Sequence, residues 1–200
     1  SVISHLKRVA PDRLTAIREY LVSVVPTVQG LERKAIGPME TLEFRQDVAG
    51  AKYPWRFLAQ NMSDGTLRAL GVITALLQSN VDYSPTLIGI EEPETALHPA
   101  ASAALREVLV QAAAHTQVLV TSHSPDLLDD PSIDADSILS VVSEGGETKM
   151  APLDTASRTV LRDHLFSAGE LLRMDQLAPD RNAIEQQNAS QSELFAEALS

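Results

Sequence analysis

Three short stretches of the sequence place polar side chains where a strand or a loop would meet a helix. They are Ser63-Asp64-Gly65-Thr66, Glu91-Glu92 and Ser122-His123-Ser124. A serine–glycine turn at the start of a helix can offer backbone N–H groups to an anion. Paired carboxylates can hold a cation or orient a water molecule, and a histidine can exchange a proton. Together the stretches point to chemistry on a phosphate-like group at the edge of an α/β sheet.

The pair Glu91-Glu92 is the strongest of these signals. It ends an apolar run over residues 86–90 that has the length and composition of a buried parallel strand. Adjacent side chains leave a strand on opposite faces. One carboxylate can therefore face a magnesium ion, directly or through water, while the other faces an attacking water. Two solvated loop carboxylates are the ordinary alternative, but the strand before them and Pro93 after them favour a site.

The turn at Ser63 has an ordinary explanation as well as a functional one. A serine before a helix commonly accepts a backbone N–H bond as the N-cap. The functional interpretation adds that Gly65 allows close backbone approach and that the helix N-terminus attracts an anion. We prefer the functional interpretation because this turn precedes the Glu91-Glu92 strand, with one predicted helix between them.

His123 follows a second apolar run, residues 117–121. A structural histidine bonded to a backbone carbonyl is the usual case. At this strand end, a neutral imidazole could instead hydrogen-bond a terminal phosphate or the water that Glu92 orients. A serine hydrolase would need a nucleophile on a Gly-x-Ser-x-Gly elbow, which the sequence lacks.

Glu94 and His98 lie four positions apart, a spacing that puts two side chains on one face of a helix. They could form a metal pair on that basis. Pro99 favours an N-cap or loop position for His98 instead, so a surface or loop role for both residues stays open.

The hydrophobic pattern predicts the elements that would position these residues. Helical periodicity marks residues 12–25, 64–77, 99–115, 155–165 and 168–174. Strand patterns mark residues 86–90 and 117–121, and turn signals mark hairpins over 31–47 and 137–151, with a loop or short strand over 50–61. Strands that alternate with helices predict an α/β fold, with a mostly parallel sheet flanked by helices and a small added hairpin.

The composition limits the class of protein to which the chain can belong. The 200 residues carry a formal net charge of -11, 44% of them are hydrophobic and none is cysteine. This is enough apolar material for one compact domain, and no apolar run is long enough to span a membrane. The sequence does not open as a signal peptide does, and the lack of cysteine fits a cytoplasmic protein. The acidic charge argues against a broad nucleic-acid footprint on this segment.

Taken as a set, these motifs resemble the C-terminal lobe of ABC-type ATPases of the RecF/SMC kind. A closer resemblance is to predicted bacterial AAA-family ATPases related to the OLD and AbiEii proteins. In that branch the signature reads Ser-Asp-Gly-Thr, and the Walker B strand ends in Glu-Glu-Pro-Glu followed by Leu-His-Pro. The matching residues here are Ser63-Asp64-Gly65-Thr66, Glu91-Glu92-Pro93-Glu94 and Leu97-His98-Pro99. The resemblance covers about residues 40–129 and, more loosely, the hairpin and helices that follow.

The resemblance implies a P-loop NTPase that uses ATP and Mg²⁺. Glu91 would hold the magnesium shell, and Glu92 would be the general base that orients water. His123 would be the switch residue that contacts the γ-phosphate. Such catalysis depends mainly on positioning and charge stabilisation.

The resemblance also implies an ATP-dependent homodimer with a shared site. The signature would consist of Ser63, Asp64, Gly65 and Thr66. Its serine oxygen and glycine backbone would contact the γ-phosphate of a nucleotide held by the opposite protomer. The D-loop, which crosses the dimer interface, would consist of Thr95, Ala96, Leu97 and His98.

The sequence departs from the broader ABC pattern at Asp64, Glu91 and His98, and the closer branch tolerates all three changes. A further departure is serious, because no Gly-x-x-x-x-Gly-Lys-[Ser/Thr] loop occurs and no Q-loop is recognisable. Without the lysine and backbone nest of that loop, phosphate affinity should be poor, so we expect the chain alone to be inactive. A lobe that contains the Walker A loop would come from upstream sequence or from a separate chain. The first residue is Ser1 rather than Met, as expected for a fragment.

The resemblance to these ATPases also predicts three segments in the chain. Residues 1–30 would be the end of a helical insert, and residues 31–175 would be the C-terminal lobe of the ATPase. Residues 176–200 are polar and rich in Gln, Asn and Ser, which predicts disorder or a frayed helix.

Three functions fit these observations. The first is an ATPase lobe that supplies its motifs to a composite site between two heads. The second is a non-catalytic module in which ATP drives dimerisation. The third is a metal-dependent nuclease that uses a cluster of Glu91, Glu92, Glu94, His98 and Asp126. The resemblance admits DNA repair, chromosome handling or phage defence, with DNA or a partner nuclease in the full system.

Overall fold

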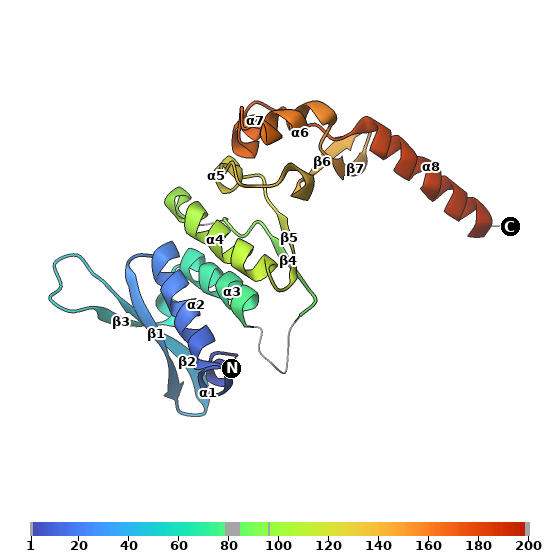
Figure 1. Ribbon diagram of the computed structural model, residues 1–200. Helices are drawn as coiled ribbons and strands as arrows, with labels where there is room; N and C mark the ends of the chain where they lie inside the picture. The colour runs from blue at the N-terminus through green and yellow to red at the C-terminus, as the bar shows by residue number, and fades with distance from the viewer. Residues whose placement is uncertain (1, 79–84, 96, 199–200) are drawn as a thin grey trace. The chain divides into compact units, whose positions relative to one another are not determined.

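The structure is a computed structural model that describes residues 2–78, 85–95 and 97–198 (Figure 1). Within it the chain divides into two compact units, Ser1–His123 and Ser124–Ser200, which we describe separately. This division falls inside the range 31–175 that we expected to form a single lobe. Among the residues described, no helix has the length and hydrophobicity that a bilayer span requires.

The first unit contains four described helices, and the second, third and fourth of them pack against one another. Its helices are α1 (Val2–Val9), α2 (Pro11–Val24), α3 (Asp64–Leu77) and α4 (Ser102–Ala113), with short 3-10 turns η1 (Ala59–Asn61) and η2 (Pro99–Ala101). Helix α2 packs against both α3 and α4. Its buried residues Leu14, Ile17, Leu21 and Val24 are those that the helical spacing predicted. The segment expected over 64–77 is confirmed to the residue.

A three-stranded antiparallel sheet packs beside these helices. It consists of β1 (Val28–Ile36), β2 (Met39–Gln46) and β3 (Trp55–Leu58), in that order. The predicted hairpin turn is confirmed, and Gly37 adopts a φ of 59° that favours glycine. Val28, Leu31 and Phe44 bury the sheet against the core. The hydrogen bond from Lys34, together with Arg56, holds the pKa of Glu43 below its ordinary value.

The strands that carry the candidate site form a parallel pair. Strand β4 (Leu87–Glu91) lies beside β5 (Gln117–Thr121), with Glu91 opposite Thr121. Ile88 and Val118 belong to the core on the side of α3 and α4. The described strands otherwise pair antiparallel, so the mostly parallel sheet that we expected is not seen among them.

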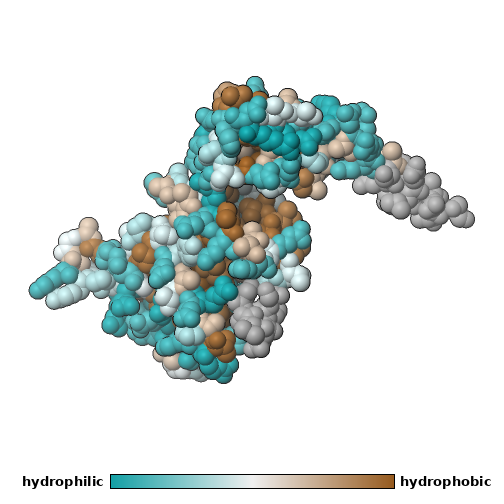
Figure 2. Space-filling view, in the orientation of Figure 1, coloured by the Kyte–Doolittle hydropathy of each residue, from teal (hydrophilic) through white to brown (hydrophobic). Residues whose placement is uncertain are grey.

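Among the residues described, the other face of β4 and β5 carries exposed apolar side chains, and we call it the bare face. Leu87 and Leu119 point to this face, and each is 54% exposed. Figure 2 shows apolar side chains gathered over these two strands. A parallel sheet usually has both faces covered, and Leu87 and Leu119 are the residues that a cover on this face would bury.

The second unit has its own small core. Its elements are α5 (Pro125–Leu128), η3 (Ala135–Ser137), β6 (Leu139–Glu144), β7 (Glu147–Pro152), α6 (Thr155–Arg162), α7 (Ala168–Arg173) and α8 (Arg181–Ala198). Strands β6 and β7 form the hairpin that we predicted. The core residues include Leu153, Leu161 and Leu171. The polar end of the chain, for which we expected disorder or a frayed helix, is helical over residues 181–198.

Helices α5 and α7 meet through a tight contact and an ion-pair network. A Cβ atom on Gly169 would lie 2.3 Å from the carbonyl oxygen of Pro125. Arg173 binds Asp129 at 3.2 Å and Asp126 at 2.8 Å. These hydrogen bonds, with Asp129 first, raise the pKa of Arg173 above its ordinary value. The absence of a side chain at Gly169 therefore allows α5 and α7 to approach this closely.

Replacing Gly169 with alanine should destabilise the protein by about 1–3 kcal/mol, because the new methyl group overlaps backbone atoms that cannot rotate away. Gly71 is the matched control. It lies inside helix α3 with nothing within 4 Å of its Cβ position. Gly71→Ala should therefore stabilise the protein by roughly 0.5–1 kcal/mol. Denaturant unfolding of both variants measures the two changes, and equal effects would contradict the contact.

Candidate functional site

Glu92 lies one residue beyond β4 in a strained backbone conformation. Its φ of 44° is in the left-handed region, which is unusual for a residue other than glycine. Its N–H donates to the carbonyl of Thr121 at 2.8 Å, and its own carbonyl accepts from the N–H of Thr95 at 3.1 Å. The end of β4 is thereby tied to the end of β5 and to the turn that follows.

The carboxylate of Glu92 has a partner at each oxygen. Its Oε1 lies 3.0 Å from Nδ1 of His123, and its Oε2 accepts from the hydroxyl of Thr95 at 3.1 Å. The His123 side chain is 80% exposed and that of Glu92 is 38% exposed. A carboxylate with open lone pairs and an accessible imidazole can orient water and exchange a proton with it.

Glu91 is exposed at the last position of β4. An exposed carboxylate of this kind suits Mg²⁺, which binds protein through one or two carboxylates and keeps water and phosphate oxygens as further ligands. In the part of the chain that is described, no group of three or more His, Asp or Glu side chains could hold a metal ion. Magnesium bound here would therefore depend on ligands from outside these residues.

The Ser63 turn caps helix α3. Ser63 Oγ accepts from the N–H of Thr66 at 3.2 Å and lies 2.9 Å from the Thr66 hydroxyl. This confirms the ordinary N-cap role. Ser63 and Asp64 are exposed, whereas Gly65 and Thr66 are buried, so the positive end of the helix dipole is open to solvent.

The segment that we expected to be a D-loop follows Glu92 directly. Besides the bond from Thr95 to Glu92, the N–H of Leu97 donates to the carbonyl of Glu94. His98 accepts from the N–H of Ala100 at 3.2 Å and caps η2, which is the N-cap alternative of the sequence analysis. Ala96 lies outside the described residues.

Two contributors to this site were missed at the sequence level. Arg68, in the second turn of α3, donates through Nη2 to the carbonyls of Glu91 and Glu92, at 2.8 Å each. Ser122 donates to the carboxylate of Glu94. A usable signal existed for Arg68, because it is the lone basic residue in the otherwise apolar stretch that follows the Ser63 turn.

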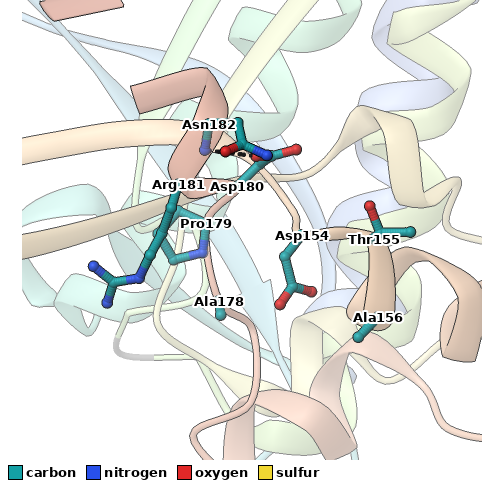
Figure 3. A pocket seen from close by; sticks show the side chains of 8 residues that line it. All are labelled: Asp154, Thr155, Ala156, Ala178, Pro179, Asp180, Arg181 and Asn182. Atoms are coloured by element: carbon teal, nitrogen blue, oxygen red, sulfur yellow. Dashed lines mark hydrogen bonds between the residues drawn. The ribbon is translucent and has the colours of Figure 1, made fainter. Parts of the chain in front are cut away.

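A pocket of about 360 Å³ in the second unit is a different kind of feature (Figure 3). It lies at the first turns of α6 and α8. Asp154 caps α6 through Ser157, and Asp180 accepts from the N–H groups of Asn182 and Ala183. Because the protein's own carboxylates occupy both helix N-termini, this pocket is poorly suited to an anion.

Comparison with known families gives a partial match. Residues 39–129 match the family model described as "AAA domain, putative AbiEii toxin, Type IV TA system". The matched region includes β2, α3, both strands of the parallel pair and α5. No curated protein matches the chain significantly in sequence. This agrees with the expectation of an AAA-type domain related to AbiEii proteins.

Solved structures with a similar fold are heads of SMC ATPases. One, titled "Structural biochemistry of ATP-driven dimerization and DNA stimulated activation of SMC ATPases", has a TM-score of 0.54 and 12% identity, over 82% of this chain and 97% of that chain. The Smc head domain with an extended coiled coil, bound to the C-terminal domain of ScpA from Pyrococcus furiosus, has a TM-score of 0.54 and 14% identity. The match covers 74% of this chain and 36% of that chain. The SMC head domain from Thermotoga maritima has a TM-score of 0.47 and 14% identity, and the match covers 76% of this chain and 51% of that chain. The first two matches show an α/β fold that resembles an SMC ATPase head.

The described geometry generates a test of the nuclease hypothesis. We expect no tight binding of Mg²⁺ or Mn²⁺ to the chain when nucleotide is absent, because Glu91 offers a single carboxylate to an ion. Calorimetric titration with each metal measures this. Tight binding of two ions that is lost in Glu91→Ala, together with metal-dependent DNA cleavage, would contradict it and favour the nuclease.

Proposed function

We propose that the chain is the part of an ATPase head that supplies the signature turn, the Walker B carboxylates, the D-loop and the switch histidine to a composite ATP site. The observation that carries this proposal is the 3.0 Å contact between Glu92 and His123 at adjacent ends of two parallel strands. The AAA-type family match over residues 39–129 and the SMC-head fold support it.

In this proposal Glu92 is the general base. Thr95 and His123 hold its two oxygens and leave further lone pairs for a water molecule. When His123 donates from Nδ1 to Glu92, its Nε2 can accept from water. The imidazolium form can also donate from Nε2 to a phosphate oxygen. The pair would thus orient water for attack on the γ-phosphate.

Glu91 would hold magnesium in the same site, directly or through water. The ion, when bound, would neutralise charge on the phosphate oxygens. Glu91 is exposed at the strand end, so its carboxylate can reach a ligand without leaving the sheet. The role of this chain is to present that oxygen beside the base.

The signature turn would serve a nucleotide held by a second protomer. Ser63, Asp64, Gly65 and Thr66 begin α3, where the exposed helix N-terminus favours a phosphate. The D-loop residues Thr95, Ala96, Leu97 and His98 would cross the interface of the ATP-dependent homodimer. ATP-driven dimerisation is named for the SMC ATPases of the first similar structure, and we extend it to this chain as part of the proposal.

A lobe with a Walker A loop is the partner that the proposal requires. The bare face of β4 and β5, with Leu87 and Leu119 each 54% exposed, supports a covering partner. This lobe would be supplied by upstream sequence or by a separate chain. DNA or a partner nuclease belongs to the wider system that the family allows.

Glu92→Gln should lower ATP turnover by about 10²–10⁴-fold in the intact protein that includes the Walker A lobe, because the amide cannot take a proton from water. ATP-dependent dimers should become long-lived. Phosphate release and light scattering measure the two effects. Glu147→Gln is the control, since Glu147 is an exposed carboxylate in β7. Unchanged turnover in Glu92→Gln would remove the base assignment and favour an ATP-gated module that does not depend on hydrolysis.

Ser63→Arg should prevent ATP-dependent dimerisation without unfolding the domain. The long cation would fill the space at the start of α3, while loss of the N-cap should cost only about 1 kcal/mol. Ser63→Ala separates these effects, because it removes the cap and adds no bulk. Dimer populations in ATP are compared by light scattering, and an unchanged population in Ser63→Arg would refute the signature assignment.

A further inference from the structure

Arg68 binds the backbone on both sides of the candidate base. Its Nη2 donates to the carbonyl oxygens of Glu91 and Glu92, at 2.8 Å each. A guanidinium carries a fixed positive charge, so these are charge-assisted bonds and stronger than neutral ones. One side chain from α3 therefore holds two successive peptide groups at the end of β4.

The two carbonyls can share one donor because the chain turns at Glu92. In an extended strand, successive carbonyls point in opposite directions. The left-handed φ of 44° at Glu92 breaks this alternation. Two carbonyl dipoles that converge repel each other, and a residue other than glycine is strained in this region. The positive charge of Arg68 offsets both costs.

The remaining contacts of Glu92 come from other elements. The carbonyl of Thr121 accepts from the N–H of Glu92, and the N–H of Thr95 donates to the carbonyl of Glu92. The Thr95 hydroxyl and His123 contact the Glu92 carboxylate and hold it. Arg68 acts on the peptide groups that set the direction of this carboxylate, together with the backbone groups of Thr121 and Thr95. Arg68 also belongs to the helix that begins with the Ser63 turn.

We infer that Arg68 is a positioning residue for Glu92. Its guanidinium holds the left-handed turn that aims the Glu92 carboxylate at His123. The inference rests on the proposed function, in which Glu92 orients the attacking water. Because α3 also carries the signature turn, Arg68 joins the nucleotide-contacting end of the helix to the base of the same chain.

Arg68→Ala should lower kcat for ATP hydrolysis on the order of 10²-fold in the intact protein, because a misplaced base loses its geometry for attack. KM for ATP should stay within about twofold. In the Glu92→Gln background the same change should add no further loss, since Arg68 acts only through Glu92. Arg68→Lys should recover part of the rate, because lysine keeps the charge but not the planar fork.

Two controls separate positioning from folding. Arg33→Ala removes an equal charge from β1, where Arg33 pairs with Glu40 on the surface, and should leave kcat unchanged. Denaturant unfolding checks each variant. If Arg68→Ala does not fold, Arg68→Lys replaces it in the double-mutant cycle. We then expect a smaller loss of kcat, which again does not add to the loss caused by Glu92→Gln.

The contact itself has a readout that needs no ATP turnover. With ¹³C-labelled glutamate carbonyls in the 200-residue chain, Arg68→Ala should shift the resonances of Glu91 and Glu92 and leave that of Glu147 in place. Unmoved Glu91 and Glu92 resonances would overturn the inference. So would an unchanged kcat, or a loss that adds to that of Glu92→Gln. A wild-type intact protein that hydrolyses no ATP while these resonances do shift would instead refute the proposed function, and the catalytic role of Arg68 with it.

Discussion

The candidate site depends on the parallel pairing of β4 with β5. Its register places Glu91 opposite Thr121, so Glu92 and His123 leave the sheet at the same edge. Two segments separated by helix α4 are thereby brought within hydrogen-bond distance. A slip of either strand by one residue would exchange its core and solvent faces. The packing of Ile88 and Val118 against the helices therefore fixes the relation between the acid and the imidazole.

Glu92 shows how the surrounding structure maintains an unfavourable conformation. A left-handed backbone at such a residue costs on the order of 1–3 kcal/mol. Contacts from three directions offset this cost, because Thr121, Thr95 and Arg68 all bind the backbone around it. The carboxylate is then held before any ligand arrives. A base that is already oriented needs little reorganisation when charge develops on the reacting group.

The sequence predicted what depends on local pattern and missed what depends on distant contacts. Hydrophobic period and capping residues gave the helix over 64–77 and the strand over 117–121 to the residue. The sequence placed Glu92 and His123 at strand ends near one water molecule, because the carboxyl ends of parallel strands share one edge of a sheet. Their direct contact was not predicted. The bond from Arg68 joins positions more than twenty residues apart, and no glycine marks the left-handed turn at Glu92. The turn at Glu92 therefore has no local signal. Arg68 stands out as the lone basic residue of its helix, but the local pattern does not indicate which groups it binds. For the polar end the sequence left disorder and a frayed helix as alternatives, and its Ala, Glu and Gln residues favour the helix that the structure has over residues 181–198.

The bare face of β4 and β5 connects the stability of the fold to the assembly of the proposed site. Fully burying a leucine contributes about 1.5–3 kcal/mol, and much of that contribution is forgone at Leu87 and Leu119. An element that covers this face would gain it. The same strands end in Glu91 and Thr121, so a covering lobe would lie beside the edge that carries Glu92 and His123. If the Walker A lobe is that element, completion of the sheet and assembly of the ATP site are a single event. The chain would then hold its base in place independently of nucleotide, and acquire nucleotide affinity only through the partner.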